Sequence, residues 1–86
     1  MPSPHICELY RKFISDLEKV LPADEKKVEQ AQSLVAELEQ EGATGTTLDN
    51  AKAALAQAQS HLDDDTNQLQ AFQDEYDAMG CPGTRP

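Results

Sequence analysis

Tryptophan is absent from this chain of 86 residues, and its aromatic side chains are limited to two phenylalanines and two tyrosines. So few large apolar side chains in so short a chain exclude more than one small hydrophobic core. Seven lysines and arginines stand against sixteen aspartates and glutamates, for a formal net charge of −9. Binding to nucleic acid through its phosphates needs clustered basic side chains, so this class of partner is excluded. We predict one domain over residues 1–86.

Long hydrophobic runs are missing as well. No stretch of about 18 apolar residues occurs, so we expect no membrane-spanning helix and no membrane partner. The N-terminal stretch MPSPHICEL has neither the basic nor the apolar region of a signal peptide. The expected location is therefore cytoplasmic by default, and secreted or in a virion if the two cysteines are oxidised.

The patterns that mark catalytic sites are also missing. There is no glycine-rich phosphate loop, no serine–histidine–aspartate set and no i, i+4 pair of zinc ligands of the kind that histidines form. The consecutive aspartates at positions 63–65 point in different directions on a helix, so they cannot converge on one ion. We expect a protein that is not an enzyme and that has no cofactor and no metal.

The residues that dominate the chain, chiefly Ala, Gln, Glu, Asp, Leu and Lys, favour α-helix over β-strand. The stretch GATGTT at positions 42–47 is the only turn-rich interval in the interior. This composition predicts an all-α fold. Its parts are a first helical arm over about 4–41, a turn over 42–46, a second arm over about 47–79, and a tail with proline and glycine over 80–86.

Local signals mark the ends of these arms. Ser3 precedes Pro4, which is typical of an N-cap followed by proline at the first helical position. Thr46, with Asp49 three residues later, resembles a capping box at the start of the second arm. Gly80 is typical of the position just beyond a helix C-terminus.

Apolar residues in both arms recur at alternating spacings of three and four, so each arm carries a continuous heptad seam with one aspartate in it. Two such seams joined by a short turn predict an antiparallel helical hairpin of the coiled-coil type, able to assemble into a dimeric four-helix bundle. The seam residues are Cys7, Tyr10, Ile14, Leu17, Leu21, Asp24, Val28, Ala31, Val35 and Leu38 in the first arm, and Leu48, Ala51, Leu55, Ala58, Leu62, Asp65, Leu69, Phe72, Tyr76 and Met79 in the second.

Pro22 lies inside the first arm, where it removes a helical hydrogen bond. Two interpretations follow: the arm is one helix kinked at Pro22, or it is broken there into two helices, with Asp24 capping the second. The seam keeps its phase from Leu17 through Asp24 to Val28, and a tight reversal gives no reason for that. We therefore expect a kink.

The two seam aspartates fall in neighbouring layers of the folded hairpin, with Lys26 and Lys27 in the same region. A buried carboxylate needs a proton or a cation partner. We interpret Asp24, Asp65, Lys26 and Lys27 as a partly hydrated, salt-bridged layer that fixes the register of the helices. The alternative is a metal or proton-linked site. His61, on the flank of the seam, is expected to contact a neighbour such as Asp65.

A second apolar row runs beside the seam of the first arm. Ile6, Phe13, Val20 and Leu34 recur at multiples of seven, interrupted by Lys27. The row either widens the core or forms an exposed surface that pairs with another chain. Because a two-helix hairpin buries little by itself, we expect an interaction surface here.

The two cysteines lie near opposite ends of the sequence but are almost equidistant from the turn. A hairpin brings Cys7 and Cys81 together, so we predict a disulfide at its open end. Three alternatives remain. The thiols stay reduced, or they join His5 in a soft-metal site, or the Cys81-Pro82 dipeptide supplies a haem-binding thiolate.

A short acidic chain folded as a helical hairpin resembles the two-helix substrates of type VII secretion. Those proteins carry a Trp-x-Gly motif at the turn, and this chain has no tryptophan. Tyr76 does not complete their C-terminal motif either, because position 80 is Gly80 rather than an acidic residue. The resemblance therefore covers topology and assigns no family.

These observations predict a small, acidic, non-catalytic protein–protein interaction module. Its partner is expected to be a second copy, as a homodimer, or another protein. Two alternatives are an acidic inhibitor of a basic enzyme surface, of the kind that phages or mobile elements encode, and a secreted or virion structural element stapled by Cys7 and Cys81.

Overall fold

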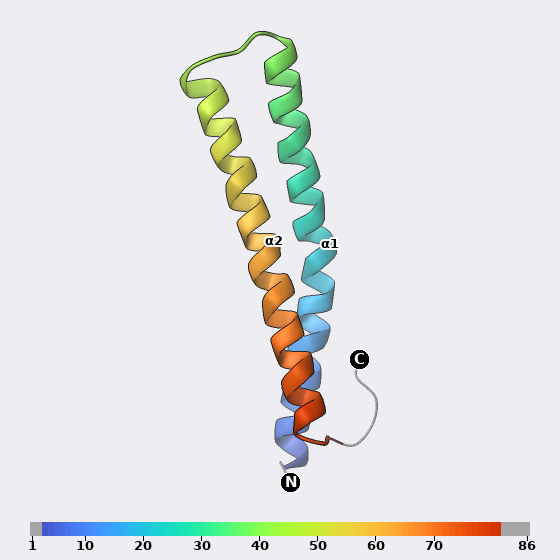
Figure 1. Cartoon of the computed structure of the whole chain (residues 1–86). Helices are drawn as coiled ribbons and strands as arrows, with labels where there is room; N and C mark the ends of the chain where they lie inside the picture. The colour runs from blue at the N-terminus through green and yellow to red at the C-terminus, as the bar shows by residue number, and fades with distance from the viewer. Residues whose placement is uncertain (1–2, 82–86) are drawn as a thin grey trace.

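The computed structural model describes residues 3–81, which form two α-helices packed against each other as a hairpin (Figure 1). Helix α1 spans Pro4–Gln40 and helix α2 spans Thr46–Ala78. The rod measures 60 × 15 × 15 Å. The predicted all-α hairpin is confirmed. Neither helix combines the length and hydrophobicity that crossing a membrane requires, as judged over the described residues.

The two helices begin in different ways. The side chain of Ser3 caps α1 by accepting a hydrogen bond from the Ile6 amide at 3.3 Å, as predicted. The capping box predicted for α2 is wrong by one residue. Gly45 occupies the N-cap position with φ +70°, no side chain caps the helix, and Thr46 is already helical. The left-handed conformation of Gly45 sets the direction in which the chain enters α2, and this moves the boundary.

Glycines end both helices. Gly42 has φ +76°, and its amide donates to the Glu39 carbonyl at 3.1 Å, while the Ala43 amide donates to Leu38 at 2.9 Å. This pair of bonds is a Schellman motif, which satisfies the last carbonyls of α1. At the end of α2, Gly80 has φ +68°, and the prediction for this position is confirmed.

Helix α1 continues through Pro22 without a corner. Pro22 is exposed, so the carbonyl that it leaves without a helical donor lies on the outer side of the helix. The seam residues before and after Pro22 all face α2, which explains why the phase of the pattern is kept. The alternative of two short helices meeting at this position is wrong.

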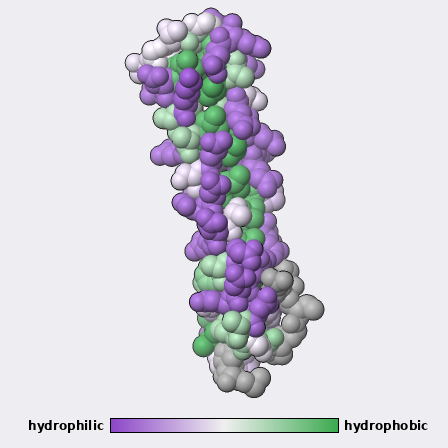
Figure 2. Space-filling view, viewed as in Figure 1, coloured by the Kyte–Doolittle hydropathy of each residue, from purple (hydrophilic) through white to green (hydrophobic). Residues whose placement is uncertain are grey.

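The predicted seam is the buried face of the hairpin. Every seam residue in both arms is buried or half-buried, and most of the other described residues are exposed. The densest packing is at the open end, where Cys7, Ile14 and Tyr76 are fully covered and Phe72 and Leu69 pack beside them. Figure 2 shows the hydrophobic surface as a narrow band along the rod, bordered by hydrophilic side chains.

A disulfide joins Cys7 to Cys81, with the two Cα atoms 5.8 Å apart. It links the first turn of α1 to the residue after Gly80, so the hairpin is closed at both ends. This bond is the pairing predicted for the open end of the hairpin, and it uses both sulfurs. Pro82 and the rest of the predicted tail, residues 82–86, lie outside the described residues.

Reduction of this disulfide is expected to destabilise the hairpin strongly. A crosslink spanning 74 residues restricts the unfolded chain, and its loss should lower the free energy of unfolding by about 4 kcal/mol. Thermal unfolding followed by circular dichroism, with and without reductant, measures the effect as a fall in Tm of roughly 15 °C or more. A double variant, Cys7→Ser with Cys81→Ser, serves as the control and should not respond to reductant. An unchanged Tm in the reduced wild-type chain would contradict the prediction.

Replacement of Pro22 by alanine should stabilise the protein. Alanine restores the missing amide donor and removes the ring that crowds the preceding turn, so we expect a gain of about 1–3 kcal/mol in chemical denaturation. The matched control is Pro4→Ala, since Pro4 is at the first helical position, where no helical donor is lost. Equal effects of the two substitutions would show that Pro22 does not strain α1.

Candidate functional site

Halfway along the hairpin, three titratable side chains from both helices converge. Asp24 comes from the seam of α1, and His61 and Asp65 come from α2, where a spacing of four residues places them on one face. The His61 Nε2 atom is 3.8 Å from Asp24 Oδ1 and 3.4 Å from Asp65 Oδ2. One ligand-type atom from each of the three residues lies within 4.8 Å of the others.

Burial differs sharply across this cluster. Asp24 is only 3% exposed, whereas the side chain of His61 is 64% exposed. The Oδ2 atom of Asp24 is buried and has no hydrogen-bond partner among the described residues. A buried acceptor without a donor costs free energy, so the cluster is incomplete unless a proton or a cation joins it.

The electrostatics of the cluster follow from this arrangement. The pKa of the Asp24 carboxyl is raised, first because a hydrogen bond with Asp65 favours the protonated form. Burial and the negative charge of Asp65 raise the pKa further, while the charges of His61 and Lys27 act in the opposite direction. When Asp24 and Asp65 are both ionised, neither can donate a hydrogen bond to the other. When one of them is protonated, its hydroxyl can donate to the other carboxylate.

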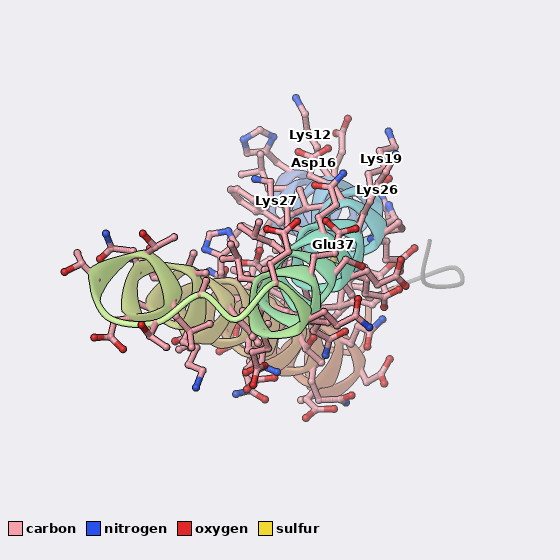
Figure 3. All side chains as sticks on the ribbon, turned by 90° about the horizontal axis from the view of Figure 1, so that it is seen from above. Lys12, Asp16, Lys19, Lys26, Lys27 and Glu37 are labelled. Atoms are coloured by element: carbon pink, nitrogen blue, oxygen red, sulfur yellow. A yellow bond between two sulfur atoms is a disulfide. The ribbon has the colours of Figure 1, made fainter. Side chains whose placement is uncertain are left out.

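The structure places the four predicted polar-seam residues in two groups. Asp24 and Asp65 are brought together, and Lys27 lines a hollow beside them. Lys26 projects from the side of α1 away from α2, as do Lys12 and Lys19 (Figure 3). Within residues 3–81, the close side-chain contacts to the two aspartates of this layer come from His61 rather than from Lys26 or Lys27.

His61 and Asp65 form a pair at i and i+4, which the sequence predicted as an ordinary polar contact rather than as part of a site. The contact between them was predicted and is confirmed. What the sequence did not reveal is that Asp24 completes the set from the opposite helix, because that depends on the exact register of the hairpin.

Nearer the open end, an apolar groove lies on the surface between the helices. It is lined by Phe13, Leu17, Val20 and Phe72, with polar side chains at its edges. The Phe13 side chain is 50% exposed, and its ring stacks on Phe72 with the centroids 5.6 Å apart. The other residues of the predicted interaction surface, Ile6 and Leu34, are also exposed, as is Leu9.

A polar contact set holds this part of α2 in place. The Tyr10 hydroxyl donates a hydrogen bond to Glu75 Oε2, which raises the pKa of Tyr10, and Arg11 Nη1 donates to the Tyr76 hydroxyl at 3.0 Å. The Tyr10 ring also meets Phe72 edge to face, with centroids 5.4 Å apart. The Phe72 ring therefore contacts both Tyr10 and Phe13.

No protein-family model matches the chain, and no curated protein or solved structure gives a significant match. The function therefore rests on the chain's own residues, and two features carry chemistry. One is the Asp24–His61–Asp65 cluster, which holds a buried unpaired oxygen. The other is the groove around Phe13 and Val20, which exposes apolar surface.

Replacement of Asp24 by asparagine tests the cost of the buried carboxylate. The amide has the shape of the protonated carboxyl and a donor for Asp65. In the presence of a chelator at pH 7, we expect the free energy of unfolding to rise by about 1 kcal/mol. The folded-state pKa of Asp24 lies above its ordinary value of 3.8. The wild-type chain therefore loses stability relative to Asp24→Asn as pH rises through the folded-state pKa, and the difference vanishes well below 3.8.

The measurement is urea unfolding of both chains at a series of pH values. Asp63→Asn is the control. Asp63 is exposed and lies two residues from Asp65, so this substitution removes the same charge without changing a buried group. A gain of equal size in the control would assign the effect to net charge. Destabilisation by Asp24→Asn at pH 7 would contradict the prediction.

Proposed function

We propose that this chain is a small acidic, non-catalytic interaction module that pairs with a second copy of itself through the groove around Phe13 and Val20. The observation that supports this proposal is the half-exposed Phe13 ring, which sits on an apolar groove instead of in the core. The assembly expected from such pairing is a four-helix bundle of two hairpins.

The small size of the core is the first support. Fully buried side chains are few, and several large apolar residues of α1 remain exposed. Burying a fully exposed side chain such as phenylalanine contributes about 1.5–3 kcal/mol. Phe13 is 50% exposed and Val20 is 40% exposed, so covering both in each copy supplies about half of that value per side chain. Single exposed apolar residues need no explanation, but here they share one side of one helix.

The spacing of the row is the second support. Phe13 and Val20 are seven residues apart, so they lie in one line along α1. In an antiparallel pair of α1 helices centred between these two positions, Phe13 of each copy faces Val20 of the other. Such a contact is self-complementary, as two-fold symmetry requires. Lys27 of each copy then lies away from the centre, which separates the like charges.

Net charge distinguishes pairing with a second copy from the alternative, which is inhibition of a basic enzyme surface. Each copy carries a formal net charge of −9, so two copies repel each other at long range and should associate more strongly as salt is added. An acidic inhibitor bound to a basic enzyme surface would behave in the opposite way, because salt weakens attraction between opposite charges.

A second candidate, a secreted or virion structural element, is favoured by the disulfide. A crosslink between Cys7 and Cys81 persists in oxidising surroundings and is uncommon in the cytosol. This candidate is compatible with self-pairing, because it specifies the compartment of the protein and self-pairing specifies its partner. The number of free thiols in protein taken directly from its native source, alkylated before purification, tests it. Two free thiols would exclude it.

The Phe13→Glu variant tests self-pairing. A carboxylate in the groove cannot be buried against a second copy, so we expect the dissociation constant of the dimer to rise by about 30-fold or more. Sedimentation equilibrium over a range of protein and salt concentrations measures the mass of the wild type and of the variant. The wild type should be dimeric, and more so at high salt.

The control is Gln32→Glu, which adds the same charge at an exposed position on the opposite flank of α1. It should leave the dimer intact. A monomeric wild-type chain at all concentrations, or equal weakening by both variants, would overturn the proposal. Circular dichroism of each variant confirms that the helices are retained.

A further inference from the structure

We propose that Asp24, His61 and Asp65 form a binding site for one zinc ion, which links α1 to α2 midway between the turn and the disulfide. The site supplies one nitrogen and two carboxylate oxygens from two helices. It goes beyond the proposed self-pairing, because it is complete within one chain and uses none of the side chains that line the apolar groove.

The distances between the ligand atoms fit such an ion. Atoms bound to a tetrahedral zinc ion at about 2.0–2.1 Å lie about 3.3–3.4 Å from one another. His61 Nε2 is 3.4 Å from Asp65 Oδ2, which is already this separation, and 3.8 Å from Asp24 Oδ1. All three ligand atoms lie within 4.8 Å of one another, so the side chains have to draw closer around the ion, and the exposed imidazole of His61 has room to turn.

The buried oxygen of Asp24 is the independent sign of a missing partner. Only 3% of Asp24 is exposed to solvent. Its Oδ2 atom accepts no hydrogen bond within the described part of the chain. A buried carboxylate beside a second carboxylate is stable only if positive charge joins them. A divalent cation provides that charge and also coordinates the oxygens that no hydrogen bond satisfies.

The donor set selects the metal. Calcium takes six to eight oxygen ligands and magnesium keeps an octahedral shell of oxygens, so a site with one imidazole and two carboxylates suits neither. Zinc accepts histidine and aspartate together, and three protein ligands leave a fourth position for water. A hollow lined by Lys27, Ala54 and Ala58 opens beside His61 and gives solvent access to that position.

Among the described residues, the lysine whose charge acts on Asp24 is Lys27, and this charge opposes a bound cation. Its side chain is exposed, so it can turn into solvent when the ion binds. The net charge of the three ligands with neutral His61 is −2, which balances a zinc ion. Binding therefore neutralises the layer, and because only the folded hairpin assembles the three ligands, zinc stabilises the fold by mass action.

The test uses the full chain with its disulfide intact, freed of metal by a chelator and dialysed. Zinc chloride is titrated by calorimetry, and Tm is measured with and without zinc. We expect one zinc ion per chain and a rise in Tm. Magnesium and calcium chloride at the same concentrations should leave Tm unchanged.

Three single variants, Asp24→Asn, His61→Gln and Asp65→Asn, should each weaken zinc binding by about tenfold or more. Asp63→Asn and His5→Gln are the matched controls, and both should bind zinc as the wild type does. Asp24→Asn is expected to be more stable than the wild type without metal, so its loss of zinc binding cannot be assigned to unfolding. Phe13→Glu should keep the zinc site, which separates this test from the test of self-pairing.

Several outcomes would overturn the proposal. No zinc binding by the wild type would do so directly. Binding that survives both Asp24→Asn and Asp65→Asn would show adventitious contact with the acidic surface. Binding lost in His5→Gln would place the ion at the N-terminus, and one ion per two chains would mean that the site is not complete within one hairpin.

Discussion

The register between the two helices is the constraint on which the rest of this molecule depends. Two closures fix it: the glycine turn at one end and the Cys7–Cys81 bond at the other. A slip of one heptad would keep apolar residues facing each other along most of the seam, so the seam alone does not select one register. It would, however, pull the cysteines apart and move Asp24 away from His61. The open-end crosslink therefore stabilises the fold and also positions the polar cluster.

The polar layer in the seam lowers the stability of the folded hairpin, and the packing of the other layers has to offset that loss. Leucine at position 24 would fill the same layer and need no partner, while Asp24 leaves a buried oxygen unsatisfied. Pro22, only two residues away, weakens the helix in the same region. The most strongly packed layers, around Ile14 and Tyr76, lie towards the disulfide. Stability is thus concentrated at the open end, and the unfavourable residues gather in the middle of the rod.

Much of the fold could be predicted from the sequence because the relevant signals are local or periodic. The three-and-four spacing identified the buried face at every described seam position, and Ser3, Gly80 and the cysteine pair were placed correctly. Two things were not predictable. The start of α2 depends on the left-handed conformation of Gly45, which a Thr–Asp pair does not reveal. The convergence of three side chains depends on the register to within a fraction of a helical turn, and heptad counting gives only the layer.

The groove and the cluster open on the same side of the hairpin. Phe13, Val20, Lys27 and Leu34 share one position of the heptad, so they form a single row along α1. The row changes from apolar to polar at Lys27, which lies against the hollow beside Asp24 and His61. The polar interruption of the row therefore lies beside the polar layer of the seam. In a pair of hairpins centred between Phe13 and Val20, Lys27 lies at the edge of the contact, where His61 keeps its access to solvent. The proposed self-pairing and the proposed ion binding would then use adjacent layers of one face without competing for a side chain.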